Sequence, residues 1–430
     1  MFTRFRPMTA TAMAAILGCS MLAMTAPAAA KEKPKKEEPA KGPSLTPSKA
    51  FQPVGKQMED ASKKKDAAAL QAAVTAGQAA ATTNDDKYFL GFYTLQLGIL
   101  TKNEALQEQG LDTALDSGLT PPADQGLYNF YSGRFAYMKK DYPKAQKRLE
   151  AAKAAGSAET SLPMLLMDTY LSQNQVDQGL AVAKAAIAAD QAAGRVPSEE
   201  LFVRPAKALQ AAKRTDDLLD ILTLRVRAYP IPAVWRNTLY ILLQQSGGDK
   251  DLNIDVLRLM SATNSMAERG EYLEYAALAT EAGFPGEVVA VVKQGINKKI
   301  FTEKDERFGS ILTTQTERAN SDRPGLFADA AKPVTAANAK SARATGDALV
   351  GFGDPAKAIP FYESVAATDP VALYRLGVAQ ALAGQTDAAV STFSKVQGNR
   401  ARLAQLWTIH VQAKAAPAAP APTPAATPAS

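Results

Sequence analysis

The chain has 430 residues, a formal net charge of +6, one cysteine and one histidine. Its length exceeds the roughly 250–300 residues at which a single hydrophobic core stops growing, so it must form several domains or a repeating structure. One cysteine and one histidine exclude an internal disulfide and a Cys/His zinc site, and they leave little scope for catalysis by a histidine base. No cofactor and no metal are expected.

The positive charge lies at the N-terminus. Residues 1–30 contribute +2 and residues 31–49 contribute +3, which leaves +1 for the chain from Ala50 onward. Binding of phosphates requires a broad basic face, and the main body of the chain lacks the charge for one. Nucleic acid is therefore excluded as the expected partner, and no motif indicates a small-molecule substrate.

Residues 1–30 have the parts of a secretory signal peptide. Arg4 and Arg6 precede an apolar stretch from Ala12 to Met24, and the segment ends with three alanines at 28–30. A positive start, a short apolar middle and a small-residue exit are typical of segments removed on export. The sequence thus predicts cleavage after Ala30 and export to the periplasm of a Gram-negative bacterium.

Two alternatives remain for this segment. Ile16-Leu17-Gly18-Cys19 resembles a bacterial lipoprotein box, which would place a lipid on Cys19 and make the protein an outer-membrane lipoprotein. The uncharged stretch is also just long enough for an uncleaved anchor, because about 20 apolar residues span a bilayer. Membrane association is expected only in these two cases.

Three further segments follow. Residues 31–49 mix lysine, glutamate and proline, which predicts an extended, charged linker. Residues 413–430 are almost wholly alanine, proline and threonine, which predicts a disordered tail. Residues 50–412 show no comparable break, so one helical domain is expected there.

Helical periodicity with glycine, proline and aspartate punctuation predicts helices throughout this domain. The expected helices are 66–80, 86–101, 104–117, 124–139, 142–155, 162–172, 176–190, 198–212, 216–228, 232–246, 251–263, 270–282, 286–295, 303–318, 337–351, 355–366, 370–383, 386–396 and 398–413. Two stretches also fit a strand, namely Val288–Val292 and Leu222–Tyr229, but turn signals at helical spacing favour helix in both.

Three stretches share a spacing of glycine, alanine twelve residues on and a large apolar residue four later. Small residues at this spacing let two antiparallel helices approach closely, and the large residue is expected to fill the gap to the next unit. The three triplets are Gly133/Ala145/Leu149, Gly346/Ala358/Tyr362 and Gly377/Ala389/Phe393.

These stretches resemble tetratricopeptide repeats, which are 34-residue helix–turn–helix units. Clear repeats cover 124–156, 340–370 and 371–400, with Asn129 where the family prefers tryptophan and with the last two units only 31 residues apart. The segment 195–335 shows helix pairs without the signature and is expected to be degenerate. The resemblance implies an all-α fold, a right-handed α-solenoid of TPR-like repeats.

The resemblance also implies a partner-binding face. Side chains on the concave face of such a solenoid hold a peptide or protein by distributed contacts, and arginine and tyrosine dominate such interfaces. The positions that correspond to this face are Phe130, Arg134, Tyr137, Arg343, Asp347 and Tyr374.

Other motifs point to no chemistry. The run Asp249–Asp255 begins like a calcium loop but has Ile254 and Met260 where glycine and a bidentate glutamate are needed, so a helix cap is expected there. Glu363-Ser364 resembles the Glu-Ser pair of lytic transglycosylases, yet it lies inside a well-matched repeat helix.

The expected function is that of a non-enzymatic periplasmic scaffold or adaptor, which binds a protein or peptide of the cell envelope on its concave face. Two alternatives remain. One is a lipid-anchored component of an outer-membrane assembly machine. The other is a peptidoglycan-cleaving enzyme with a helical superhelix, whose sign would be a non-repeat fold around 195–335 with a buried glutamate in a cleft.

Overall fold

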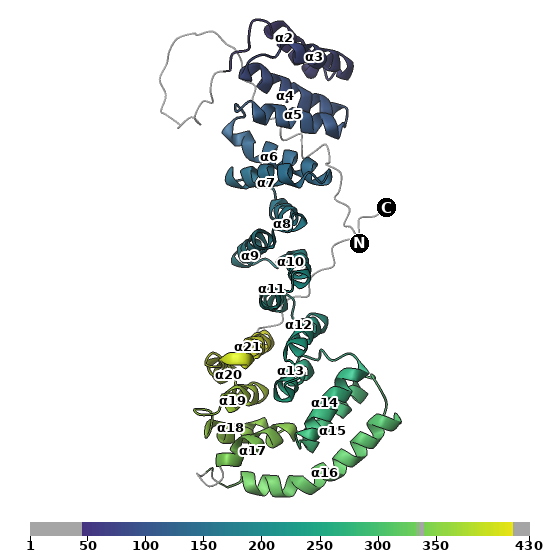
Figure 1. Ribbon diagram of the computed structural model, residues 1–430, viewed down its shortest axis with the longest axis vertical. Helices are drawn as coiled ribbons and strands as arrows, with labels where there is room; N and C mark the ends of the chain where they lie inside the picture. Colours follow the sequence, from purple (N-terminus) through teal and green to yellow (C-terminus); the bar gives the residue numbers. More distant parts are fainter. Residues whose placement is uncertain (1–44, 333, 335–338, 416–430) are drawn as a thin grey trace. The chain divides into compact units, whose positions relative to one another are not determined.

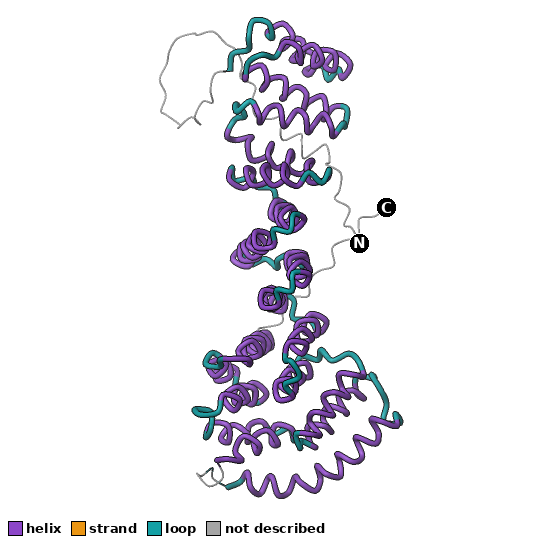
Figure 2. Tube along the Cα trace, viewed as in Figure 1, coloured by secondary structure: helices purple, strands orange, loops and turns teal. Residues whose placement is uncertain are grey.

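A computed structural model describes residues 45–332, 334 and 339–415, and all regular structure in these residues is helical (Figures 1 and 2). The expected signal segment with Cys19, residues 31–44 of the linker and residues 416–430 of the tail lie outside the described residues. Within the described part, no helix is long and apolar enough to cross a membrane.

The chain divides into two compact units, with the boundary between Ala208 and Leu209 inside helix α10. The first unit consists of four consecutive helix pairs followed by helix α10. These helices are α2 (Gln52–Lys63), α3 (Ala67–Ala80), α4 (Asn84–Leu100), α5 (Glu104–Asp116), α6 (Pro122–Met138), α7 (Tyr142–Ala154), α8 (Leu162–Ser172), α9 (Val176–Ala192) and α10 (Glu200–Ala211).

The second unit is a chain of helix pairs that turns back on itself (Figure 1). Helices α11–α15 form an outgoing leg, the 25-residue helix α16 makes the turn, and α17–α21 form a return leg beside the outgoing one. The elements are α11 (Thr215–Ala228), α12 (Pro232–Gln245), α13 (Lys250–Ala262), α14 (Arg269–Glu281), α15 (Pro285–Asn297), α16 (Glu306–Ala330), α17 (Ala339–Gly351), α18 (Pro355–Glu363), α19 (Pro370–Leu382), α20 (Thr386–Phe393), the 3₁₀ turn η2 (Gly398–Arg400) and α21 (Ala401–Ala415).

Most pairs share one turn chemistry. A residue in the left-handed backbone region follows the end of the first helix, and the next residue is the N-cap of the second. In the α6–α7 turn, Lys140 has φ 63° and the carboxylate of Asp141 accepts a hydrogen bond from the backbone N–H of Lys144 at 3.2 Å. Asp and Asn are favoured at this position because the side chain satisfies an orphan N–H at the helix start. The left-handed residues of the turns are Lys65, Lys102, Lys140, Asn174, Lys213, Gly283, Gly353 and Gly384.

The three triplets mark close crossings of paired helices, as expected, because their alanines are fully buried. The large residue also packs on the glycine of its own unit, and Phe393 in addition stacks on Trp407 of the following helix α21, with ring centroids 6.3 Å apart. A Cβ added to Gly377 would lie 2.6 Å from the ring of Phe393, and one added to Gly133 would lie 2.8 Å from Leu149. Each glycine therefore leaves the space that the large side chain of its own unit occupies.

The closest crossing in the first unit was not predicted. Helices α4 and α5 meet through Gly91, Gly98 and Gly110, and a Cβ on Gly110 would lie 2.3 Å from the backbone nitrogen of Leu95. These glycines do not follow the triplet spacing, so the pattern did not reveal them.

Two helices differ from expectation. Helix α2 was not predicted, and it forms because Phe51 and Met58 are buried against Leu70 and Val74 of the next helix. Helix α16 was expected to end at 318, but it continues through Pro324 to Ala330. Its last turns pack Leu326 and Phe327 against the core of α17–α19, which favours continued helix over a break at the proline.

The segments with strand-like patterns are helical, since they lie in α11 and α15. Consecutive packing of neighbouring helices continues from α11 to α16, although that part of the chain lacks the repeat signature.

Candidate functional site

The first helices of the pairs in the first unit carry one cluster of polar side chains. Three of the expected partner-binding residues lie on α6. Phe130 is buried, whereas Arg134 and Tyr137 are half-buried. Phe130 thus contributes to the core through an edge-to-face contact with Tyr131, at 5.1 Å between ring centroids.

Tyr137 joins α6 to the next two first helices. Its hydroxyl donates a hydrogen bond to the carboxylate of Asp168 on α8. Arg204 on α10 also pairs with Asp168, and its Nε donates to Glu200 at 2.7 Å. The ring of Tyr142 packs edge-on against Tyr137 at 5.8 Å. We call these five residues the α6–α10 cluster.

Asp168 has the most perturbed carboxyl group of this cluster. Burial raises its pKa to about 6, and the attraction of Arg204 only partly opposes that shift. Burial also raises the pKa of Tyr137, with a further contribution from the charge of Asp168. The cluster therefore presents a half-buried tyrosine and a cation around a carboxylate that is ionised at neutral pH.

The other expected partner-binding residues lie in the return leg of the second unit. Asp347 on α17 and Tyr374 on α19 are buried, and Arg343 keeps about 40% of its side chain exposed while it pairs with Asp369 at 3.3 Å. The burial of Phe130, Asp347 and Tyr374 leaves Arg134, Tyr137 and Arg343 as the members of the expected set with exposed surface.

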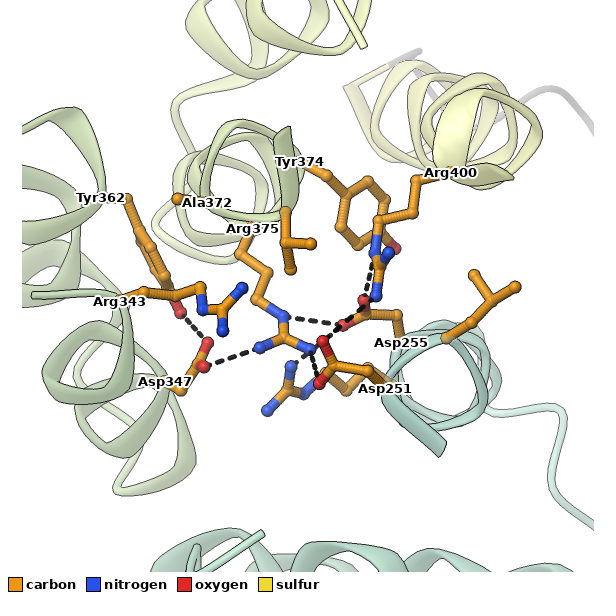
Figure 3. Close-up of polar contacts among 12 residues, drawn as sticks. Asp251, Asp255, Arg343, Asp347, Tyr362, Ala372, Tyr374, Arg375 and Arg400 are labelled. Carbon is orange, nitrogen blue, oxygen red and sulfur yellow. Dashed lines mark hydrogen bonds and ion pairs between the residues drawn. The ribbon is translucent and has the colours of Figure 1, made fainter. Parts of the chain in front are cut away.

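Asp347 and Tyr374 are buried because helix α13 covers the face of the return leg on which they lie (Figure 3). The central residue is Arg375, which is only 3% exposed. Its guanidinium donates to Asp347 at 2.7 Å and to Asp255 of α13 at 3.0 Å. It also reaches Asp251, one turn earlier on α13, at 3.0 Å.

Asp255 is the second centre of this charge network. Besides Arg375, its carboxylate accepts hydrogen bonds from Arg400 of η2 at 2.8 Å and from Arg258 at 3.1 Å. Arg258 also holds Glu287 of α15 through two bonds of 2.8 Å. Tyrosine hydroxyls complete the shell, since Tyr275 donates to Glu287 and Tyr362 donates to Asp347, both at 2.6 Å.

The buried members of the network balance in charge. Three arginines (258, 375 and 400) face three carboxylates (255, 287 and 347), and all six are at least nine-tenths buried. Burial alone would raise the pKa of Asp255, but the three arginines hold it below its usual value. At Asp347 the effect of burial exceeds the attraction of Arg375, so its pKa is raised.

The single histidine is also structural. His410 on α21 lies between the two tryptophans of the chain, with ring centroids 6.0 Å from Trp235 and 5.7 Å from Trp407. Burial, with a smaller effect of Lys414, lowers its pKa to about 4, so the imidazole is neutral at physiological pH.

The described residues hold no group of three or more histidine, cysteine, aspartate or glutamate side chains that could bind a metal ion. The expected calcium-like run is a helix cap, because Asp249 accepts hydrogen bonds from the N–H groups of Asp251 and Leu252. The two most buried glutamates of 195–335 are both engaged. Glu287 is held by Arg258, and Glu271 accepts from the backbone at the start of α14 and from Arg236.

Sequence reasoning did not find the charge network. Its members lie far apart in the sequence, with Asp255 and Arg400 separated by 145 residues, so no local motif joins them. One signal was present, namely that Asp255, Arg258 and Arg375 each stand in an otherwise apolar helical run. Charges in such runs face the core and require partners there.

No family model and no curated protein matches the chain. Among solved structures, it is similar to one titled Naa15/Naa10 bound to HypK-THB, with 11% identity, a TM-score of 0.36 and coverage of 84% of this chain and 54% of that one. The chain thus spans about half the length of that neighbour.

Two further solved structures are similar. The P58(IPK) TPR domain has 12% identity and a TM-score of 0.21, with coverage of 76% of this chain and 99% of that one. The human IFIT1 dimer with m7Gppp-AAAA has 12% identity and a TM-score of 0.22, with 80% of each chain covered. TM-scores this low carry no argument on their own, so the fold rests on the helix pairs, their turns and their glycine contacts. The chain is an all-α solenoid of TPR-like repeats.

Proposed function

We propose that this protein is a non-enzymatic scaffold that binds a protein or peptide of the cell envelope on the first-helix face of its first unit. The observation that carries this proposal is the contrast between two equivalent faces. In the return leg of the second unit the face is filled by α13, whereas the α6–α10 cluster of the first unit keeps half-exposed aromatic and charged groups.

The energetics favour the first unit as the partner site. A partner could reach Asp347 and Tyr374 only by removing α13, which would separate buried ion pairs. Breaking a buried pair by removing one member costs about 3–5 kcal/mol. The α6–α10 cluster needs no such opening, because Arg204 is already about a quarter exposed and Glu200 about half exposed.

The chemistry of the described residues supports binding rather than catalysis. The buried carboxylates of the second unit are neutralised by arginines, and the near-neutral body of the chain does not favour nucleic acid. Tyrosine and arginine on neighbouring helices are the side chains that most often anchor protein interfaces.

The envelope location is part of the proposal and rests on residues 1–30, with export by a cleaved signal as the first candidate. A lipid on Cys19 is the alternative, and it would make the protein an anchored component of an outer-membrane assembly machine. The mass of the mature N-terminus distinguishes them, since an acylated Cys19 is incompatible with a chain that starts at Lys31.

The binding face is tested by photocrosslinking in cells. A photoreactive residue at Tyr137 should capture an envelope protein that is not captured from Lys147, an exposed position on the second helix of the same pair. Arg204→Ala should reduce the yield from position 137. Equal capture from both positions, or none from 137, would overturn the proposal.

A further inference from the structure

The second unit has an open groove away from the charge network. Its volume is about 720 Å³, and it lies between α12, the segment joining α13 to α14, and the end of α15. The opposite side of α12 packs inward through Trp235 and Leu239. The groove is lined by Pro232, Ala233, Arg236, Asn237, Tyr240, Asn264, Ser265, Met266, Ala267 and Lys298.

The cations of this groove already have partners. Arg236 pairs with Glu271 at 2.7 Å and with Glu268 at 2.8 Å. The ammonium of Lys298 donates to the carbonyl of Asn264 at 3.1 Å and to that of Met266 at 2.5 Å. A charged occupant would therefore find no unpaired cation among the lining residues, so the groove suits an uncharged one.

The remaining lining residues indicate which chemical groups the occupant must present to the groove. Tyr240 is 47% exposed, so its aromatic surface is open to solvent. The side-chain amides of Asn237 and Asn264 form no hydrogen bond within the described residues, and each can donate to a carbonyl. Aromatic surface next to such donors is how proteins recognise extended proline-rich segments, whose carbonyls are not used internally.

This chain contains such a segment. Residues 416–430 are uncharged and include five prolines. They follow α21, which ends at Ala415 in the same unit and packs against α12, with the His410 and Trp235 rings 6.0 Å apart. Fifteen residues in an extended polyproline conformation span about 46 Å, roughly twice the 21 Å length of α12, so the segment can pass around that helix.

We propose that residues 416–430 bind in this groove as an internal ligand, with proline rings on Tyr240 and backbone carbonyls accepting from Asn237 and Asn264. A linked segment binds at a high effective concentration, so even weak contacts keep the groove covered. This inference is independent of the proposed partner face, which lies in the other unit.

The first test uses the full chain with a photoreactive residue at position 240. Trypsin cuts after Lys414 and releases residues 415–430 as one peptide, so mass spectrometry can identify the adduct. We expect this peptide to be joined to α12, with a yield that does not change on dilution. The control is the same residue at Leu382, which is 46% exposed in the same unit and should give no such adduct.

The second test adds a synthetic peptide of residues 416–430 to a chain that ends at Ala415. We expect saturable binding that Tyr240→Ala weakens about tenfold, as for loss of an aromatic anchor. Leu382→Ala should leave the affinity unchanged, and the full chain should bind the added peptide more weakly than the shortened one.

Three results would overturn the proposal. The first is the absence of an adduct between position 240 and residues 415–430, or equal yield from 382. The second is an adduct only between chains, revealed by mixing isotopically light and heavy protein. The third is a shortened chain that does not bind the peptide, or binds it equally well with Tyr240→Ala.

Discussion

Arg375 contacts carboxylates from two helices of the second unit, and replacing it tests how much the charge network stabilises that unit. Arg375→Met should lower the free energy of unfolding by about 3–5 kcal/mol, because it leaves buried carboxylates without their shared cation. Urea unfolding followed by tryptophan fluorescence measures this, since Trp235 and Trp407 both lie in the second unit.

The matched control is Arg343→Met, the same substitution at an arginine of the same unit that is exposed rather than buried. Arg343 is 40% exposed and its pair with Asp369 spans 3.3 Å. Exposed pairs contribute about 0–1 kcal/mol, so this variant should change the unfolding free energy by less than that. Equal losses for the two arginines would contradict a special role for the buried network.

His410 gives a second prediction at the residue scale. Its folded pKa of about 4 lies below the value near 6.5 expected for an unfolded chain. The unfolded state therefore takes up a proton as the pH falls through this interval while the folded state does not. The contribution of His410 to stability should be complete above about pH 6.5 and should decline as the pH falls toward 4.

Proton NMR checks the pKa directly, because the chain has one histidine and a purification tag other than polyhistidine keeps the spectrum to one imidazole. His410→Gln should flatten the pH dependence of the unfolding free energy in the same interval. An imidazole that titrates near pH 6.5 in the folded protein would refute this assignment.

At the scale of helix pairs, the glycine contacts are the feature that mutation can test most cleanly. Gly377→Ala places a Cβ 2.6 Å from the ring of Phe393, so either the ring or the helix must shift. Overpacking of this kind costs about 1–3 kcal/mol. Thermal unfolding monitored by circular dichroism should show the loss, and a second change, Phe393→Leu, should restore part of it.

Gly325→Ala is the opposite case. This glycine lies inside helix α16, and a Cβ there meets nothing within 4 Å. The substitution should stabilise the protein by about 0.5–1 kcal/mol, because alanine is the better helix former. If Gly377→Ala were equally stabilising, the close crossing of α19 and α20 would not be present in solution.

The helix pairs could be predicted from the sequence because their signals are local. Gly133, Ala145 and Leu149 lie within 17 residues, and the crossing they predict depends on nothing else in the chain. Asp255 and Arg375 are 120 residues apart, and their pairing depends on the turn made by α16. Helix α16 itself continues through Pro324 only because tertiary packing on α17–α19 outweighs the local penalty.

In the candidate site, too, the features with a local signal could be predicted and those set by long-range contacts could not. Tyr137 follows from repeat spacing, and the structure leaves it half-buried on α6. Spacing also selects Asp347 and Tyr374, but spacing cannot show that α13 covers them. Whether the face of a repeat is exposed depends on contacts with residues far away in the sequence. A local sequence pattern does not reveal such contacts.

At the scale of the whole molecule, the two compact units predict two unfolding transitions. Arg375→Met should lower the urea midpoint seen by tryptophan fluorescence, which reports only on the second unit. Far-ultraviolet circular dichroism reports on both units. In the variant, the transition of the first unit should keep the urea midpoint that it has in the unmodified protein. Repeat proteins couple mainly between neighbours, so destabilisation should not spread evenly through the chain. Identical shifts by both probes would indicate one cooperative body.

The long sequence separation of the charge network has a consequence for synthesis. Asp255 is translated 120 residues before Arg375 and 145 before Arg400, so α13 exists for that time with its carboxylate unmatched by either arginine. Contacts of such range form late, because loop closure must precede them. A nascent chain, or one cut short before Gly398, would therefore present the charged face of α13 and the apolar face of the repeats after it to chaperones and proteases. Asp255 therefore gains its full set of arginine partners only after Arg400 has been translated.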